Sequence, residues 1–423
     1  MSDTHHVGLT VTAAMPWRPL LEGAVAERAM TALNAIVEAL AKPPEEESTT
    51  PSLSGGDSGY SLLFTYLAQV FPGRGYDDVA LVYLERAFDG AARLTLTPGL
   101  YIGYSGIAWT AQHLRGRLLD PDEDTNEEID AALEQALGAG LWPEYDLIRG
   151  LVGIGVYAIE RLPQPAAVTC LDAVLSQLAQ LAVEDHEGLR WWSTPLRPGR
   201  RADHLHDVGL AHGVAGAVSL LAEICRVAPP ELATRARPLL DGTIKWLLGQ
   251  RLPQAGACFP AVVEPGFPSQ PTRSAWCYGD PGVGMALLGA GRAVGVKSWC
   301  DEALATLHGA AARPIAEVQA IDPGLCHGTA GLAHLYHRAY RATGDEALGA
   351  IARSWFERTL EMHHPGEGVG GFRSWQPTDG GDWHWVDDPG LLTGSTGIAL
   401  ALLSAVAPVV PAWDRMLGYF ALD

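Results

Sequence analysis

The feature that most constrains this chain is a G-x-x-G motif that occurs seven times. Its first glycines are Gly56, Gly103, Gly150, Gly213, Gly279, Gly328 and Gly394, with successive gaps of 47, 47, 63, 66, 49 and 66 residues. One such motif means little in a chain with 48 glycines, but each of the seven opens an apolar run, as in IGVYAIERL and IALALLSAV. Repetition at this period is typical of architectures in which neighbouring units bury a shared core.

The segments between these runs are charged and amphipathic. Their apolar residues return at three- and four-residue steps, so each predicts a helix with one face to bury. The predicted helices span 27–42, 77–93, 126–139, 167–183, 231–248, 301–313 and 345–362. The runs after the glycines are apolar nearly all round, which indicates buried helices.

The alternation predicts an all-α fold, an (α/α)7 toroid of seven inner and seven outer helices. We expect a single domain over residues 1–423, with 1–20 as a loose N-terminal segment. Glycines at the starts of the inner helices would permit close approach of backbone in the crowded centre. Strand-like alternation is scarce, so a parallel sheet is not expected.

Composition excludes some partners and locations. The chain has 29 Lys and Arg against 49 Asp and Glu, a net charge of −20, which argues against binding nucleic acid. We find no secretory signal and no apolar stretch near the roughly 20 residues of a membrane span. We therefore expect a cytoplasmic protein. Six cysteines in so long a chain do not make a disulfide framework, so a special cysteine is a candidate metal ligand or nucleophile.

Long connections precede the fourth, fifth and seventh motifs, at 184–211, 250–278 and 363–393. Such connections are usually functional or disordered, and these should lie over one end of the barrel. Tryptophans are concentrated in them, at Trp191, Trp192, Trp375, Trp383 and Trp385. Two interpretations stay open: aromatic residues that keep the loops folded, or walls of a substrate cleft.

Two cysteines stand in matching repeat positions. Cys277 in W-C-Y-G and Cys326 in L-C-H-G each lie two residues before a first glycine, and His327 follows Cys326. His212 in A-H-G is in register with His327. Repeat symmetry should bring these side chains to the same end of the barrel. Two cysteines and one histidine suit zinc with one position open, as in catalytic rather than closed structural sites.

The alternatives are weaker. His204, His206 and His212 offer a second metal set, but this H-x-H pair has no match in the repeat register. Simple burial accounts best for the four other cysteines, Cys170, Cys225, Cys258 and Cys300.

These motifs also resemble a known family. A-H-G at 211–213, R-x-x-x-C-Y-G at 273–279 and C-H-G at 326–328, within seven G-x-x-G repeats, are similar to those of the lanthionine synthetase C-like proteins. The resemblance runs from about residue 20 to the end of the chain, and it is to the stand-alone cyclases of class I lanthipeptide pathways.

The resemblance implies a chemistry. A cysteine thiol of a dehydrated peptide would add to dehydroalanine or dehydrobutyrine, forming a lanthionine or methyllanthionine thioether ring. One zinc ion per chain would be held by Cys277, Cys326 and His327. His212 would be the acid/base group, and Asp146 would orient or charge it.

The resemblance further implies that Arg273 and Tyr278 are polar site residues and that Trp276 forms a pocket wall that binds substrate. Arg273 would hold the enolate oxygen or fix Asp146. The implied partners are a precursor peptide with its leader, a separate dehydratase and an export transporter, with association to a membrane-located biosynthetic complex as an option.

Three other classes of function are compatible with a helical toroid. A helical glycosidase needs two carboxylates, for which Asp146 and Asp280 are candidates, but it leaves the cysteine register unexplained. Protein prenyltransferases activate thiols with zinc on a toroid of six repeats. A zinc-containing peptide-binding or regulatory scaffold, or a glutathione-adding relative without ring formation, is the main alternative to the cyclase.

Overall fold

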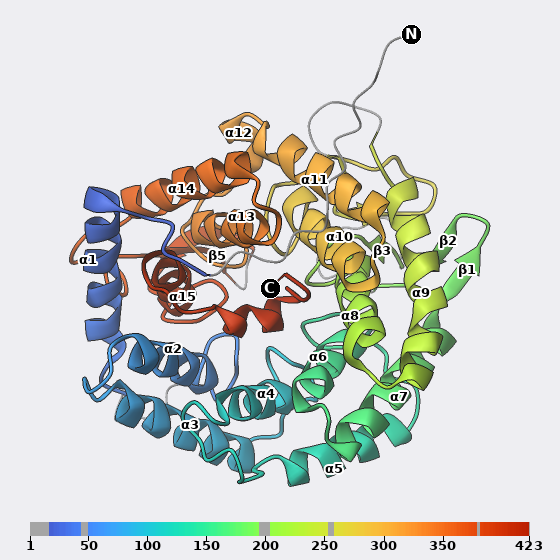
Figure 1. The fold of residues 1–423 in the computed structure, drawn as a ribbon, viewed down its shortest axis with the longest axis horizontal. Coiled ribbons are helices and arrows are strands. Elements are labelled where there is room, and N and C mark those ends of the chain that lie inside the picture. The colour runs from blue at the N-terminus through green and yellow to red at the C-terminus, as the bar shows by residue number, and fades with distance from the viewer. Residues whose placement is uncertain (1–16, 44–49, 194–203, 253–257, 379–380, 423) are drawn as a thin grey trace.

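The fold is a closed double ring of helices, shown in Figure 1, in a computed structural model that describes residues 17–43, 50–193, 204–252, 258–378 and 381–422. The inner helices of this described part are α2 (Asp57–Val70), α4 (Tyr104–Leu114), α6 (Leu151–Arg161), α8 (Val214–Val227), α10 (Asp280–Val294), α13 (Thr329–Thr343) and α15 (Ser395–Val406). The outer helices are α1 (Gly23–Leu40), α3 (Tyr76–Arg93), α5 (Glu127–Gly138), α7 (Pro165–Leu181), α9 (Pro230–Gly249), α11 (Lys297–Ala311) and α14 (Glu346–Glu361). A short helix, α12 (Ile315–Val318), follows α11. The predicted toroid is confirmed.

The ring closes out of sequence order. Neighbouring inner helices contact one another from α2 to α15, and α15 contacts α2 again. Each of the outer helices from α3 onward packs on the inner helix before it, whereas α1 packs on α15 and α14. The first outer helix, α1, thus covers the last inner helix, α15. None of the helices within the described ranges is long and apolar enough to cross a membrane.

The glycines of the repeats are required by close backbone approach. A Cβ atom on Gly103 would lie 1.9 Å from the carbonyl oxygen of Thr97, and one on Gly331 would lie 1.8 Å from that of Leu325. In both cases the oxygen belongs to the residue six positions earlier, and the same conflict recurs at the other motifs. The chain therefore makes a tight turn into each inner helix that only glycine accommodates.

These turns are joined by hydrogen bonds between repeats, which we call the belt. Its residues stand two positions before each first glycine: Ser54, Tyr101, Ile148, Ala211, Cys277, Cys326 and Leu392. Each of them accepts a backbone hydrogen bond from the neighbouring repeat, at distances of 2.7–3.4 Å, and the bond from Leu392 to Ser54 closes the circle. The donor is the belt residue itself except in the third repeat, where Leu147 donates to Ala211. The belt fixes the spacing of the residues around the mouth of the barrel.

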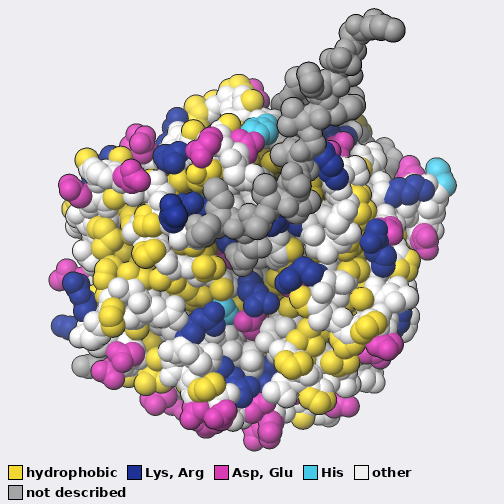
Figure 2. Space-filling model, viewed as in Figure 1, with side chains coloured by type: hydrophobic (Ala, Val, Ile, Leu, Met, Phe, Trp, Pro, Cys, Tyr) yellow, Lys and Arg dark blue, Asp and Glu magenta, His cyan; other side chains and the backbone are white. Residues whose placement is uncertain are grey.

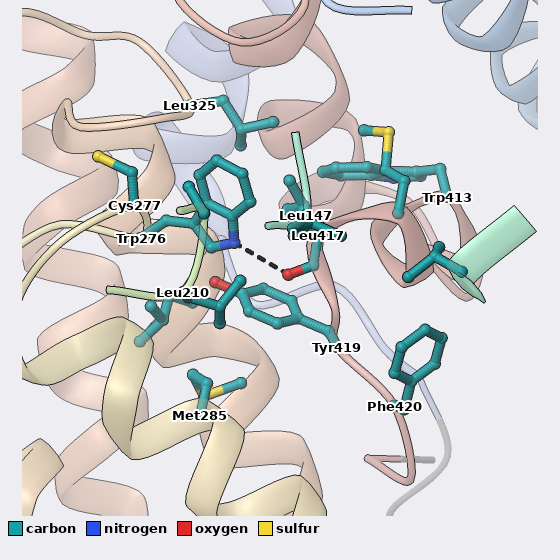
Figure 3. Packing of buried hydrophobic residues seen from close by; sticks show 14 of the residues in the cluster. Leu147, Leu210, Trp276, Cys277, Met285, Leu325, Trp413, Leu417, Tyr419 and Phe420 are labelled. Atoms are coloured by element: carbon teal, nitrogen blue, oxygen red, sulfur yellow. Dashed lines mark hydrogen bonds between the residues drawn. The ribbon is translucent and has the colours of Figure 1, made fainter. Parts of the chain in front are cut away.

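One residue earlier in each repeat is a buried apolar side chain. These are Leu53, Leu100, Leu147, Leu210, Trp276, Leu325 and Leu391. They point into the barrel, where the C-terminal segment (residues 411–422) fills the rest of the centre, as Figure 3 shows for Trp276 and Leu417. The 3-10 helix η1 (Ala412–Leu417) lies in this segment, and Asp414 pairs there with His334 and Arg338.

The N-terminal segment is partly fixed. Residues 1–16 lie outside the described residues. Trp17 Nε1 donates to the carbonyl of Ser404 at 3.1 Å, and the Leu20 amide donates to that of Ala405 at 2.8 Å. Residues 17–20 are therefore docked on the end of α15, and the expectation of a loose segment is wrong for them.

The long connections contain three short two-stranded antiparallel sheets. They are formed by β1 (Val183–Asp185) with β2 (Gly188–Arg190), β3 (His206–Asp207) with β4 (Val262–Val263), and β5 (Ser374–Pro377) with β6 (Trp383–Val386). Of these, β1–β2 and β5–β6 are hairpins, and β3–β4 joins two different connections. Strands of two to four residues are too short to show a periodicity in sequence. Charge is also distributed unevenly: Figure 2 shows Lys and Arg gathering near the middle of the face it presents, with Asp and Glu mostly at the rim.

Candidate active site

The belt places Cys277, Cys326 and His327 together. The Cys277 amide donates to the carbonyl of Cys326 at 3.4 Å, which makes the two repeats neighbours at this point. One ligand atom from each of the three residues lies within 4.8 Å of the others. Cys277 is buried and the other two are half-buried. Two sulfurs and one imidazole at this spacing fit a zinc ion with one position left for another ligand.

The charges of this cluster support the same interpretation. A hydrogen bond with Cys326 lowers the pKa of Cys277 well below its ordinary value, although burial opposes it, and the same bond raises the pKa of Cys326. One thiolate and one thiol thus share a proton. Burial would lower the pKa of His327, but Asp322 and Cys277 raise it to about 9. Metal binding would displace these protons, since thiolate and neutral imidazole are the ligating forms.

Asp322 is the carboxylate beside His327. Its Oδ2 lies 3.6 Å from His327 Nε2 and accepts the Trp375 amide at 3.0 Å, and its Oδ1 accepts the Gly324 amide at 3.0 Å. A carboxylate on the second nitrogen of a ligating histidine fixes the ring and raises its basicity. Asp322 was not predicted from the sequence. It stands six residues before Gly328, and Asp207 and Asp388 occupy the same repeat position.

His212 and Asp146 form a second pair of interacting side chains. His212 Nδ1 lies 2.6 Å from Asp146 Oδ2, and the Arg149 amide donates to Asp146 Oδ1 at 2.7 Å. Burial disfavours the charged imidazole, but the hydrogen bond and charge of Asp146 outweigh it, so the pKa of His212 is raised. Nδ1 is committed to Asp146, which leaves Nε2 as the nitrogen that can exchange a proton.

Tyr278 has a carboxylate partner that the sequence analysis did not identify. Its hydroxyl donates to Asp207 Oδ2 at 2.9 Å, and the Gly209 amide donates to Asp207 Oδ1 at 2.9 Å. Burial raises the pKa of Asp207 from 3.8 to about 6, against the opposing effects of His212 and Tyr278. Asp207 also adds to the negative charge that favours a protonated His212.

All of these groups except Asp146 and Asp322 line one cavity of about 400 Å³, together with Arg273. Arg273 is half-buried, and among the described residues its guanidinium makes no hydrogen bond or ion pair, with Asp146 or any other residue. It is a positive charge turned to the pocket, and it favours the thiolates of Cys277 and Cys326. The lining residues are Ile148, Leu205, Asp207, Ala211, His212, Ala261, Val262, Thr272, Arg273, Cys277, Tyr278, Cys326, His327, Trp383 and Leu392.

Trp276 does not join them, which corrects the expectation that it forms a pocket wall. It is 1% exposed, and its indole Nε1 donates to the carbonyl of Leu417 at 3.0 Å (Figure 3). Its repeat position, one residue before the belt, points into the barrel like the leucines of six other repeats. Trp276 therefore packs beneath the site.

The alternative ligand sets are also placed elsewhere. His206 is buried with Nδ1 on the carbonyl of Trp191, and His212 faces Asp146, so the H-x-H set does not assemble. Asp280 is fully buried and accepts hydrogen bonds from the amides of Cys258 and Phe259. It is therefore not free to act on a sugar together with Asp146. Burial raises the pKa of each of the four other cysteines.

The tryptophans divide between the two interpretations left open. Trp191 is buried, stacks on Tyr145 and donates to the Leu178 carbonyl, so it keeps its loop folded. Trp383 lines the pocket. Trp192 and Trp385 are 43% and 39% exposed.

The chain is similar to known proteins in sequence and in fold. The profile of a family described as "Lanthionine synthetase C-like protein" matches residues 47–417. The curated protein "Glutathione S-transferase LANCL1" of Danio rerio is 24% identical over 308 residues, which cover 69% of this chain and 70% of that protein. The structure named "Nisin cyclase" has a TM-score of 0.70 at 20% identity, covering 95% of this chain and 98% of the other. A sugar epimerase from a ruminal bacterium has a TM-score of 0.48 at 12% identity, covering 91% and 98%.

Proposed function

The chain belongs to the lanthionine synthetase C-like family, and from that premise we propose that it is a zinc-dependent lanthipeptide cyclase. The observation that carries the proposal is that the Cys277–Cys326–His327 cluster opens into the same cavity as His212 and Arg273. The reaction is addition of a cysteine thiol across the double bond of dehydroalanine or dehydrobutyrine. A C–S bond forms at the β-carbon, the thiol proton leaves, and the α-carbon gains a proton.

Cys277, Cys326 and His327 would hold one zinc ion, and Asp322 would keep His327 in place. Zinc would lower the pKa of a substrate thiol bound to it. Because two cysteine thiolates already neutralise most of the zinc charge, the bound substrate thiolate would stay nucleophilic. The chain's own residues then have two tasks: stabilising the enolate that attack creates, and managing its proton.

His212 is the proton-transfer group in this proposal. Asp146 raises its pKa, so a larger fraction of the ring is imidazolium near neutral pH. That form can return a proton to the enolate carbon, and the neutral form can accept the thiol proton. Arg273 would hold the enolate oxygen, because its guanidinium is a positive charge facing the cavity. The Tyr278 hydroxyl is already donated to Asp207, so its oxygen is better placed to accept than to donate.

The proposed substrate is a precursor peptide with a leader, whose residues are dehydrated by a separate dehydratase in the cytoplasm. The cyclised peptide would then pass to an export transporter. The second candidate function is addition of glutathione to dehydrated residues, favoured by the similarity to the Danio rerio protein named as a glutathione S-transferase. The Cys277 cluster would serve either thiol.

The test is zinc content per chain in the wild type, Cys277→Ala and His212→Ala, paired with a thiol assay. The probe is a synthetic peptide with one dehydroalanine and one cysteine, because ring closure consumes a thiol without changing mass. We expect about one zinc in the wild type and in His212→Ala, and little in Cys277→Ala, with thiol consumption in the wild type alone.

A folded wild type without zinc would overturn the metal assignment, and loss of zinc from His212→Ala would make His212 a ligand. A peptide with dehydroalanine but no cysteine, incubated with glutathione, separates the two candidate functions. Gain of one glutathione by that peptide, without ring closure in the first, would favour the second candidate.

A further inference from the structure

A row of three tryptophans leads out of the reaction cavity along the β5–β6 hairpin. Trp375 pairs with Trp385 across the two strands, and Trp383 stands two residues before Trp385, so all three share one face of the hairpin. The Trp375 ring centroid lies 6.5 Å from that of Trp383 and 5.2 Å from that of Trp385. The three rings form a continuous aromatic surface, which we call the tryptophan face.

The two ends of this face lie in two different cavities. Trp383 lines the reaction cavity, together with His212, Arg273 and Cys277. Trp385 lines a second cavity of about 330 Å³. The other residues of this second cavity are Ile321, Pro323, Met362, His364, Glu367, Gly371 and Arg373. A chain bound at the reacting centre can therefore pass over the tryptophan face into the second cavity without leaving the protein surface.

The hairpin is fixed to the barrel by its opposite face and its ends. The Trp375 amide donates to Asp322 Oδ2 at 3.0 Å, and Gln376 Nε2 donates to Thr393 Oγ1 at 3.1 Å. Within the hairpin itself, an Arg373 side-chain nitrogen donates to the Trp385 carbonyl at 2.9 Å. Asp322 is the carboxylate that also faces His327, so the hairpin and the metal cluster share an anchor. The tryptophan face is thus preformed at a constant position relative to the reacting centre.

Exposure singles out the far end. Trp385 is 39% exposed and Ile321 is 53% exposed, although both border a cavity. Soluble proteins seldom present aromatic and aliphatic side chains together at the rim of a cavity unless that surface binds something. Tryptophan is also the residue that most often contributes a large share of the binding free energy at peptide and protein interfaces.

We propose that the tryptophan face and the second cavity form a subsite for the substrate peptide, which binds an apolar segment adjacent in sequence to the reacting cysteine. This inference rests on the proposed function for the reaction cavity. The occupant is a segment of the same peptide because the surface is continuous with that cavity through Trp383. Extended chain covers about 3.3 Å per residue, so about four residues span the tryptophan face, whose rings are 6.5 Å and 5.2 Å apart.

The probes are two synthetic peptides. The core peptide carries one dehydroalanine and one cysteine, and the extended peptide adds eight residues rich in leucine beside the cysteine. A dye-labelled extended peptide with serine in place of cysteine measures binding by fluorescence anisotropy without any reaction. The variants are Trp385→Ala and Ile321→Ser, which change exposed side chains from two different segments. Trp192→Ala is the matched control, because Trp192 is equally exposed and lines neither cavity.

We expect Trp385→Ala and Ile321→Ser each to weaken binding of the extended peptide about tenfold, or about 1.4 kcal/mol, with no change in Trp192→Ala. Turnover of the core peptide should match the wild type in all three variants. Equal binding of the extended peptide by wild type and both variants would overturn the subsite. An equal loss of turnover with the core peptide in the two variants would also overturn it. A change of oligomeric state in either variant, measured by light scattering, would assign the face to a second copy of the chain. Binding is measured without turnover, so absence of cyclisation in the wild type would count against the proposed function and not against the subsite.

Discussion

Replacing Asp207 with asparagine should change how stability depends on pH. Asp207 is 3% exposed, and burial raises its pKa from 3.8 to about 6. Between these values the folded protein holds a proton that the unfolded chain has lost, so stability falls as pH rises through this window. At about 1.4 kcal/mol per pKa unit the cost of ionising Asp207 reaches about 3 kcal/mol at neutral pH.

Asparagine at this position keeps the size and polarity of the side chain but cannot ionise. The free energy of unfolding of Asp207→Asn, minus that of the wild type, should therefore increase by about 3 kcal/mol between pH 4 and pH 7. The absolute offset depends on how asparagine bonds Tyr278 and the Gly209 amide, but the change with pH does not. Urea unfolding at several pH values measures it, with a chelator present so that bound metal does not contribute. A difference that stays constant across this range would refute the assignment of a buried, proton-holding Asp207.

Three further predictions concern other parts of the fold. Asp146→Asn should lower the pKa of His212, because the hydrogen bond and charge that outweigh burial are removed; an NMR titration of the His212 ring that shows no change would contradict the pairing. Trp276→Ala should lose about 4 kcal/mol of stability through a cavity beneath the site, and Trp276→Phe about 1 kcal/mol with the lost hydrogen bond, as judged by urea unfolding. Equal losses in the two variants would count against this packing. Gly331→Ala should lose about 2 kcal/mol or more, since its Cβ would lie 1.8 Å from a carbonyl oxygen, whereas Gly138→Ala, with nothing within 4 Å, should be neutral in thermal unfolding.

The fold was predictable because its signal is repeated. Each glycine pair marks a tight turn, and each apolar run a buried helix, so seven weak signals combine into one architecture. The predicted outer helix 77–93 differs from the observed α3 by one residue at its start. The ligand cluster was predictable for the same reason: Cys277 and Cys326 occupy the same repeat position, and the belt brings neighbouring positions together.

What the sequence did not reveal are the roles of Asp207 and Asp322 beside the site. Asp207 and Asp322 stand at a repeat position that is not uniform, since Thr50, Thr97, Glu144, Arg273 and Asp388 fill it elsewhere, and the pairing of Asp207 with Tyr278 becomes visible only when distant side chains meet. Trp276 was misassigned because Arg273, Cys277 and Tyr278, close to it in sequence, line the pocket, while its own repeat position points to the axis. Comparison with Leu210 and Leu325, at the same position, was the available signal.

The belt has a consequence for the order in which the protein matures. The bond between Leu392 and Ser54 joins the last repeat to the first, and α1 finds its partner only when α15 exists. During synthesis Ser54 and α1 leave the ribosome long before Leu392 and α15. Until then the Ser54 carbonyl lacks its hydrogen-bond donor from Leu392, and the apolar face of α1 is not covered by α15. Circle closure is therefore a late step, and a truncated chain cannot imitate the finished ring.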